Sequence, residues 1–140
     1  IFTYLSYKLY MEKYEIKNIH ECSECKVPKG WGEELIITNN EKYCGKILKF
    51  KKGFKFSMHY HMIKDETWYV NTGSFIYRWI NTETAETFEK TLVVGDVVRQ
   101  YPGSPHQLEA LEDGEVFEVS TQHFDSDSYR VWRGDSQKNN

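Results

Sequence analysis

The chain has 140 residues, of which 39% are hydrophobic, 28% are charged and 16% are aromatic, and its formal net charge is −3. A chain of this length forms one domain around a single core. Its nearly balanced charge excludes the strongly basic surface with which proteins bind nucleic acid or anionic membranes, so we expect neither partner.

The first segment, residues 1–30, predicts an irregular N-terminal extension. Its opening, IFTYLSYKLY, is too polar for a secretory signal, and no run in the chain reaches the ~18 apolar residues of a membrane span, so we expect a cytoplasmic protein. Met11 is a candidate start, which would make residues 1–10 non-native or upstream sequence. The tyrosines of this segment are candidates for a homodimer interface: Tyr4, Tyr7, Tyr10 and Tyr14.

The cysteines of the chain are Cys22, Cys25 and Cys44. An odd number argues against a secreted disulfide framework. Together with His20 they could supply four ligands to zinc, but structural zinc sites usually use two paired knuckles and Cys44 stands alone. A redox-active pair is also disfavoured, because that motif belongs at a helix start after a strand. We therefore expect reduced thiols near the surface, with zinc as the alternative.

Short β-type runs bounded by turn residues follow one another along the rest of the chain. They cover residues 33–38, 46–51, 54–61, 66–71, 74–81, 87–93, 96–101, 106–111 and 115–121. Brief links rich in Gly, Asn and Asp between evenly spaced strands are typical of an antiparallel sandwich or closed barrel. We expect this barrel over residues 31–124, followed by a polar tail, 125–140, that lays one short segment around Tyr129 against the outside.

The stretch GFKFSMHYHMIKDETWYVNTG, residues 53–73, carries the clearest chemical signal. In a strand, residues two apart share a face, so His59 and His61 point to one side and Met58 and Tyr60 to the other. Glu66 begins the next expected strand and could reach the same point. Two imidazoles and a carboxylate that converge from neighbouring strands form a set of metal ligands with open coordination positions.

A fourth ligand is expected from GDVVRQYPGSPHQ, residues 95–107, in which the turn residues bring His106 to the start of a strand. The remaining histidines, His20 and His123, are interpreted as surface or turn residues. A single histidine on a strand is usually no more than a satisfied polar group, but three that converge with Glu66 favour a metal site.

These two stretches resemble the two motifs of the cupin superfamily. The first motif is matched at each defined position, by Gly53, His59, His61, Glu66 and Gly73. The second is matched by Gly95, Gly103 and His106, and it departs from the family at Tyr101, usually proline, and at Ala110, often asparagine.

The cupin resemblance implies an all-β fold, the cupin double-stranded β-helix or jelly-roll barrel. It also implies one divalent transition metal, Zn, Mn, Fe, Ni or Co, bound by His59, His61, Glu66 and His106, and pairing of chains as homodimers. The segments KGWGEE, KILKFKKG and GEVFEVST further resemble the small cupins related to the C-terminal domain of type II mannose-6-phosphate isomerases. That likeness implies a sugar or sugar phosphate as ligand and aldose–ketose isomerisation as the reaction.

Such a reaction needs a proton shuttle and, for a phosphorylated substrate, a cation. Glu118 and Lys64 are candidates for the shuttle. Arg78 and Arg99 are candidates for the cation, although exposed or ion-paired surface residues are an equally good interpretation of both. Trp68 and Tyr77 are candidates for stacking on a sugar ring, although aromatic residues on strands more often belong to the core.

Two other functions are compatible with the same ligands. One is an Fe(II)-dependent dioxygenase that acts on a small thiol or aromatic acid, because iron at such a site can bind dioxygen. The other is a non-catalytic sugar-binding or regulatory cupin, since this fold carries many unrelated functions. The sequence does not choose the metal or the substrate.

Overall fold

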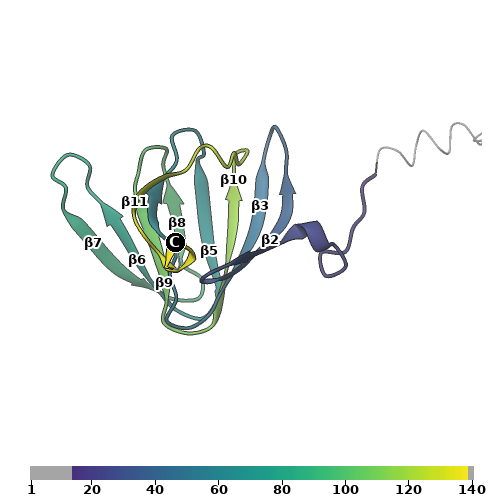
Figure 1. The fold of residues 1–140 in the computed structure, drawn as a ribbon, viewed down its shortest axis with the longest axis horizontal. Helices are drawn as coiled ribbons and strands as arrows, with labels where there is room; N and C mark the ends of the chain where they lie inside the picture. The colour runs from purple at the N-terminus through teal and green to yellow at the C-terminus, as the bar shows by residue number, and fades with distance from the viewer. Residues whose placement is uncertain (1–13, 139–140) are drawn as a thin grey trace, which may run out of the picture.

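The computed structural model describes residues 14–138, which form two antiparallel sheets that face each other (Figure 1). The six-stranded sheet has the order β1 (Lys26–Lys29), β2 (Gly32–Asn39), β3 (Cys44–Phe50), β10 (Gly114–Ser120), β5 (Glu66–Thr72) and β8 (Val97–Gln100). The five-stranded sheet has the order β11 (Tyr129–Trp132), β4 (Met58–Tyr60), β9 (His106–Ala110), β6 (Phe75–Ile80) and β7 (Thr87–Leu92). This architecture confirms the all-β prediction.

In the central strands β3, β5 and β10, side chains alternate between the core and the outside. In β10, Gly114, Val116 and Glu118 are buried while the residues between them are more exposed, and this strand pairs with β3 on one side and β5 on the other. A period of two is what a strand with one buried face requires. The sequence pattern of the run 115–121 was therefore sufficient to predict β10.

The expected strand 54–61 is shorter than predicted. Only Met58–Tyr60 forms β4; just before it, Lys55 makes an isolated bridge to Glu109 of β9 and also contacts the C-terminal segment. Lys55 donates its N–H to the Asp135 carboxylate at 2.7 Å, and the Asp135 N–H donates to the Lys55 carbonyl at 2.9 Å. The C-terminal segment at Asp135 thus provides hydrogen bonds to Lys55 of the kind that a neighbouring strand would provide.

The segment before the barrel is more ordered than expected. Within it a short 3-10 helix, η1 (Ser23–Cys25), leads into β1, which pairs with β2 at the edge of the six-stranded sheet. Pro28 lies in β1, and proline is tolerated in an edge strand because the missing N–H need not bond a neighbour. The expectations for residues 1–10, Met11 and the first three tyrosines fall outside the described residues.

The prediction of reduced cysteines is wrong for two of the three. Cys22 and Cys25 form a disulfide across η1, and Cys44 is a buried free thiol. The bridged sulfurs cannot act as thiolate ligands, so this structure does not support the zinc alternative with His20. The tight turn of η1 brings the two cysteines together.

The core lies between the sheets and is rich in aromatic rings. Phe75, fully buried on β6, contacts Phe50 of the opposite sheet with ring centroids 5.2 Å apart. Trp31, Phe56 and Trp68 belong to this core and also line the main cavity. These aromatic rings therefore lie between the packed core and the cavity, which is the hollow part of the sandwich.

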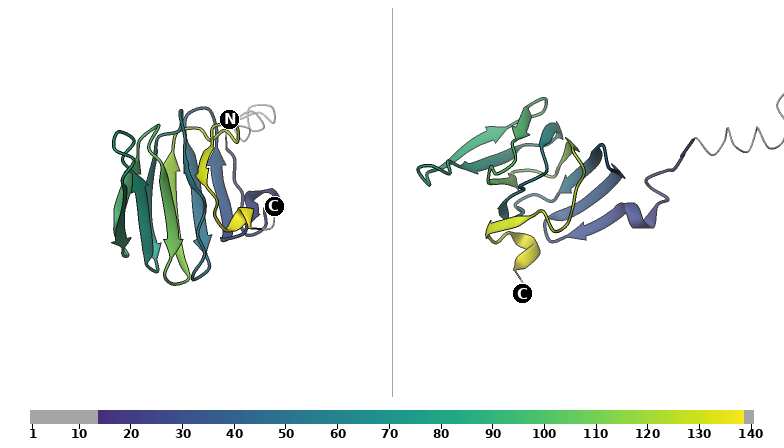
Figure 2. Two further views of the ribbon diagram at one scale, coloured as in Figure 1. Left: turned by 60° about the vertical axis from the view of Figure 1, so that its left-hand side comes forward. Right: turned by 90° about the horizontal axis from the view of Figure 1, so that it is seen from above.

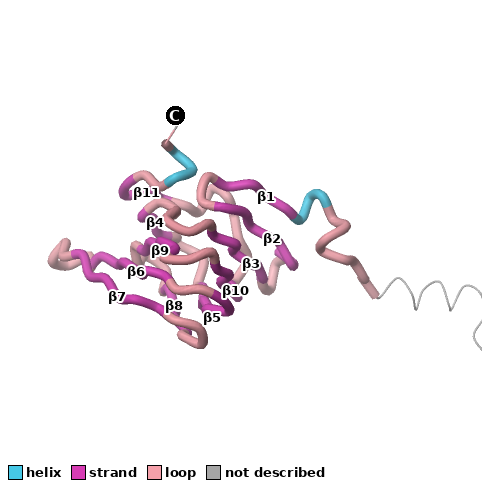
Figure 3. The backbone as a smooth tube through the Cα atoms, turned by 90° about the horizontal axis from the view of Figure 1, so that it is seen from below, coloured by secondary structure: helices cyan, strands magenta, loops and turns pink. Residues whose placement is uncertain are grey.

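The C-terminal segment runs along one side of the sandwich and touches both sheets, as seen in Figures 2 and 3. Its strand β11 pairs with β4 of the five-stranded sheet. The short 3-10 helix η2 (Asp135–Gln137) follows, and the Ser136 hydroxyl accepts a hydrogen bond of 3.0 Å from the Gly30 N–H, next to β1. The expected outer segment around Tyr129 is therefore a true strand. None of the helices in residues 14–138 has the length and apolar character to cross a bilayer.

Candidate metal centre

Three histidines converge in the hollow part of the sandwich. His59 lies on β4, His61 follows that strand, and His106 begins β9. The register of the sheet pairs His59 directly with His106, so their side chains leave the same face. One ring nitrogen of each of the three histidines lies within 4.8 Å of those of the other two.

The turn before β9 has a defined role in this arrangement. Gly103 adopts a φ of 82°, which L side chains rarely adopt, and its N–H donates to the His61 carbonyl at 2.6 Å. This hydrogen bond ties the segment before His106 to the segment that carries His61. The glycine of the second motif thus brings the two parts of the site together.

Each of the three rings is oriented by a backbone carbonyl. Nδ1 lies 2.9 Å from the Ser57 carbonyl in His59, 2.7 Å from the Asp127 carbonyl in His61 and 2.8 Å from the Ser104 carbonyl in His106. A carbonyl only accepts hydrogen bonds, so Nδ1 carries the proton and Nε2 presents a lone pair. This arrangement is the usual way in which proteins orient metal-binding histidines.

Glu66 lies beside these rings, at the start of β5 in the opposite sheet. Its Oε1 is 3.0 Å from His106 Nε2, and that nitrogen makes no hydrogen bond although it is buried. With Nδ1 protonated, a lone pair on Nε2 faces a carboxylate oxygen, which is unfavourable unless a cation or proton lies nearby. Three imidazole nitrogens and a carboxylate fit a divalent transition metal.

His59 and His61 are in the neutral form that binds metal. Burial lowers the pKa of His59 well below its usual value, and the His106 and His61 rings lower it further. Burial, followed by the Lys64 ammonium, lowers the pKa of His61 to about 4. Both imidazoles are therefore neutral near pH 7, as metal coordination requires.

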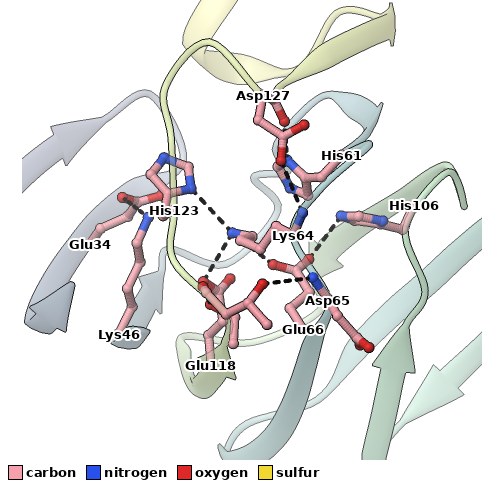
Figure 4. A network of polar contacts seen from close by, with 12 residues as sticks. Glu34, Lys46, His61, Lys64, Asp65, Glu66, His106, Glu118, His123 and Asp127 are labelled. Carbon is pink, nitrogen blue, oxygen red and sulfur yellow. Dashed lines mark hydrogen bonds and ion pairs between the residues drawn. The ribbon is translucent and has the colours of Figure 1, made fainter. Parts of the chain in front are cut away.

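A buried network of charges surrounds the carboxylate of Glu66 (Figure 4). The Lys64 ammonium lies 2.8 Å from Glu66 Oε2 and 3.1 Å from Glu118 Oε2. Burial opposes the charge on Lys64, but Glu118 and Glu66 outweigh it and raise its pKa. Burial, followed by the charge of Glu66, raises the pKa of Glu118 to about 7. Glu118 thus titrates near neutral pH while Lys64 stays charged.

These groups line a cavity of about 460 Å³. The volume is in the range of sites for small molecules. Its walls include a second buried ion pair, Lys46 with Glu34 at 3.3 Å, and the His123 ring, whose Nδ1 is 3.3 Å from the Lys64 ammonium. Exposed Lys29 and Arg130 line it as well. The cavity is therefore polar around the histidines and carries two cations where it meets solvent.

The structure places the predicted site residues in two groups. Lining the cavity are His59, His61, Glu66, Lys64, Glu118 and Trp68, and the buried His106 touches Glu66 beside it. Tyr77 is not in this lining; its hydroxyl donates to Gln100 at 2.8 Å and its ring stacks on Trp79.

The predicted phosphate-binding arginines lie elsewhere. Arg78 contacts the carboxylates of Glu89 at 3.2 Å and Glu109 at 2.7 Å, and exposed Arg99 contacts Asp65 at 2.6 Å. Neither guanidinium lines the cavity. The alternative interpretation of both, ion-paired residues away from the substrate, agrees with these contacts.

Sequence reasoning missed three residues of the site. His123 was expected at the surface, but the segment after β10 folds it back over Lys64. Lys46 lies on the same, inward-facing side of β3 as the buried residues Cys44 and Leu48. The sequence could have shown this position, because residues two apart in a strand share a face. Nothing in the sequence pointed to Asp127, whose role depends on contacts with residues more than sixty positions away.

Comparison with known proteins identifies the fold. No family model matches the chain, and no curated protein does. Solved structures of oxalate decarboxylase from Bacillus subtilis match with a TM-score of 0.68 and 18% identity over 84% of this chain and 33% of theirs. Another structure of that enzyme, described by its Mn(II) centres, has a TM-score of 0.69. The chain has the cupin fold.

Two further matches agree. The oxalate decarboxylase of Lactobacillus farciminis has a TM-score of 0.68 and 18% identity over 84% of this chain and 37% of that one. The capsular polysaccharide assembling protein CapF of Staphylococcus aureus has a TM-score of 0.65 and 20% identity over 76% of this chain and 32% of that one. This chain spans about a third of the length of these proteins. Likeness at this level of identity shows the fold, and the three-histidine cluster shows a candidate metal site within it.

Proposed function

We propose that this cupin is a metal-dependent enzyme that moves a proton on a sugar or sugar phosphate, in an aldose–ketose isomerisation. The observation that carries the proposal is the position of Glu118. Its carboxyl lines the cavity that the histidines share, contacts the Lys64 ammonium at 3.1 Å and has a pKa raised to about 7. A general acid–base catalyst works best when its pKa is near the working pH.

The residues divide the work in the following way. His59, His61, His106 and Glu66 would hold the ion. A divalent ion supplies a Lewis acid that polarises a carbonyl oxygen of the substrate. Isomerisation then requires one group to take the proton from the hydroxyl-bearing carbon beside that carbonyl and return it to the former carbonyl carbon. The hydroxyl proton moves from one oxygen to the other in the same reaction, so no proton is consumed overall.

Glu118 is the group we assign to this proton transfer, with Lys64 as its partner. The Lys64 ammonium bridges Glu118 and Glu66, so it holds the Glu118 carboxyl in place and stabilises its ionised form. Both side chains are buried, so the transfer occurs where few water molecules compete.

The cations for a phosphate or other acidic group are Lys29 and Arg130 in this proposal, in place of Arg78 and Arg99. Both line the cavity and are exposed, whereas the two predicted arginines lie outside it. Trp68 is an aromatic wall beside the candidate ligands, with its ring 5.2 Å from that of His106. CapF, one of the proteins that share this fold, is named for assembling capsular polysaccharide, and carbohydrate is compatible with a cavity of this kind.

The test is a screen of aldoses, ketoses and their phosphate esters in D₂O by NMR. The protein is loaded in turn with Mn(II), Fe(II), Co(II), Ni(II) and Zn(II). Isomerisation through proton transfer between adjacent carbons predicts a ketose or aldose product and solvent deuterium at the exchanged carbon. Uptake of oxygen with the iron form would instead favour a dioxygenase. Ligand-dependent thermal stabilisation without product or exchange would favour a binding protein.

The variant Glu118→Gln sharpens the test. It keeps the size of the side chain and one oxygen for Lys64 but cannot carry the proton. We expect turnover to fall by roughly 10²- to 10⁴-fold, the usual contribution of a general acid–base group. Metal content measured by mass spectrometry should be unchanged. Full activity of this variant would rule out Glu118 as the shuttle.

Pairing as a homodimer and a cytoplasmic location stay proposals. Sedimentation velocity of the purified protein tests the first. The Cys22–Cys25 disulfide weighs against the second, because disulfides persist mainly in oxidising compartments. Free-thiol titration of protein isolated from its cell decides whether the bridge exists there.

A further inference from the structure

We propose that Asp127 is a positioning residue of the candidate metal centre, through which the C-terminal segment fixes the loop between His61 and Glu66. The inference rests on the proposed metal site and goes beyond the assigned ligands. Asp127 lies between β10 and β11, is 4% exposed, and belongs neither to the ligand set nor to the proton shuttle.

The Asp127 carboxylate accepts hydrogen bonds from the loop through both of its oxygens. One oxygen accepts from the N–H groups of Met62 at 2.8 Å and Ile63 at 3.1 Å. The other accepts from the N–H of Lys64 at 3.0 Å and again from Ile63 at 3.2 Å. A single side chain thus holds three successive backbone groups of the loop that links His61 to Glu66.

The backbone of Asp127 contacts one of the candidate metal ligands directly. The Asp127 carbonyl accepts the hydrogen bond from His61 Nδ1, at 2.7 Å. This contact sets the tautomer of the ring and turns Nε2 toward the other two histidines. Asp127 therefore acts on a ligand with its carbonyl and on the loop after that ligand with its side chain (Figure 4).

The end of this loop is held at Asp65, which exchanges hydrogen bonds with Thr121 and pairs with Arg99, but the first residues of the loop are attached through Asp127. The side chains of Met62 and Ile63 are 57% and 63% exposed, so packing contributes little at these positions. Yet this loop must place both the Lys64 ammonium and the Glu66 carboxylate, which are 2.8 Å apart. The carboxylate of Asp127 supplies the attachment that apolar contacts do not.

Asp127 can position other residues because it is itself fixed. Its N–H donates to the Phe124 carbonyl at 3.0 Å, and β11 immediately after it pairs with β4. Further along, Gly134 lies so close to the backbone of Phe56 that an added Cβ would be 2.3 Å from the Phe56 carbonyl carbon. The C-terminal segment is thus packed tightly against the barrel on both sides of the contact.

The experiment compares Asp127→Asn and Asp127→Ala with Asp135→Asn. Asp135 is the matched control, because it is also a buried carboxylate that joins the C-terminal segment to the barrel, but it binds Lys55 and Lys138 and not the loop beside His61. Each full-length variant is checked for its β-sheet signal by circular dichroism. Co(II) is the probe, and its affinity and visible absorption spectrum are recorded.

We expect the two Asp127 variants to bind Co(II) about 10- to 100-fold more weakly than the wild type, the usual effect of losing a group that orients a metal ligand. Their Co(II) spectra should change, and NMR of the imidazole nitrogens without metal should show a mixture of tautomers at His61. Asp135→Asn should lose thermal stability but keep the wild-type Co(II) affinity and spectrum.

Two results would overturn the proposal. One is wild-type affinity, spectrum and His61 tautomer in the Asp127 variants. The other is an equal loss of Co(II) affinity in Asp135→Asn, which would mean that any loosening of the C-terminal segment has the same effect. Asp127→Asn keeps one acceptor oxygen and therefore provides the measurement if Asp127→Ala does not fold.

Discussion

At the scale of single residues, the site depends on how each side chain is oriented as well as on where it lies. The histidines all use Nδ1 for a backbone carbonyl, which leaves Nε2 for the ion. Such contacts cannot be read from the sequence, because they join atoms of the side chain to backbone whose path is set by the fold. The grouping of His59, His61, His106 and Glu66 as candidate ligands, by contrast, was predicted from their spacing.

Replacement of His61 by Ala is the direct test of the ligand set. The variant removes one ligand and leaves the aromatic core intact, so we expect metal affinity to fall by more than about 100-fold, beyond the effect of losing an orienting group. Metal content by mass spectrometry and the circular dichroism spectrum check the two parts of this expectation. His20→Ala is the control, since His20 is exposed and outside the cavity. Retention of metal by His61→Ala would contradict the assignment.

At the scale of elements, most strands were predicted from the sequence, including the edge strands β7 and β8, but the edge strands β1 and β11 were not. The expected runs 46–51 and 115–121 correspond to β3 and β10, in which buried and more exposed residues alternate. Neither β1 nor β11 has such a pattern, since β1 contains a proline and β11 is exposed throughout. Both exist because a neighbouring strand offers hydrogen bonds, which is a property of the assembled sheet.

The packing of β6 against the opposite sheet provides a test of stability. Phe75 is completely buried and contacts Phe50, so Phe75→Ala should lower the free energy of unfolding by roughly 3–5 kcal/mol through lost contacts and a cavity. Phe88→Ala on β7 is the control. Because the Phe88 ring is partly exposed, its removal should lower the free energy of unfolding much less. Urea unfolding of both variants measures the difference. Similar losses would mean that the core does not centre on Phe75.

The attachment of η2 predicts how stability depends on pH. Burial by itself raises the pKa of Asp135, but the Lys138 ammonium and the Lys55 N–H outweigh it and hold the pKa below its usual value. A carboxyl with a lower pKa when folded contributes stability that is complete above its unfolded pKa, about 3.9. That contribution is lost as pH falls from there through the folded value.

The free energy of unfolding should therefore decline below about pH 4 in the wild type. In Asp135→Asn it should be lower at pH 7 and should depend less on acid. Urea titrations at a series of pH values measure both curves. Parallel curves for the two proteins would show that Asp135 has the same pKa in the folded and unfolded states.

At the scale of the whole molecule, the candidate metal site joins the two sheets. His59 and His106 belong to the five-stranded sheet, while Glu66 belongs to β5 of the six-stranded sheet. An ion bound between them would bind the folded state and not the unfolded chain, and so would stabilise the sandwich.

This geometry predicts that metal raises the melting temperature. At a free metal concentration one hundred times the dissociation constant, the free energy of unfolding rises by about 2.7 kcal/mol. Removal of metal with a chelator should reverse the shift, which differential scanning calorimetry measures. His61→Ala should show no shift in either direction. A shift of equal size in that variant would place the bound metal elsewhere on the protein.

The sequence by itself determined the all-β architecture and the group of His59, His61, His106 and Glu66. Both depend on local features, namely alternation along strands and turns marked by glycine, which are written into neighbouring residues. Only the tertiary structure decided that Arg78 and Arg99 lie outside the cavity while His123 and Asp127 belong to the site. The reason is that a shift of one residue in strand register moves every side chain of the strand to the other face of the sheet. The positions of loops, in turn, are determined by their contacts with distant parts of the chain.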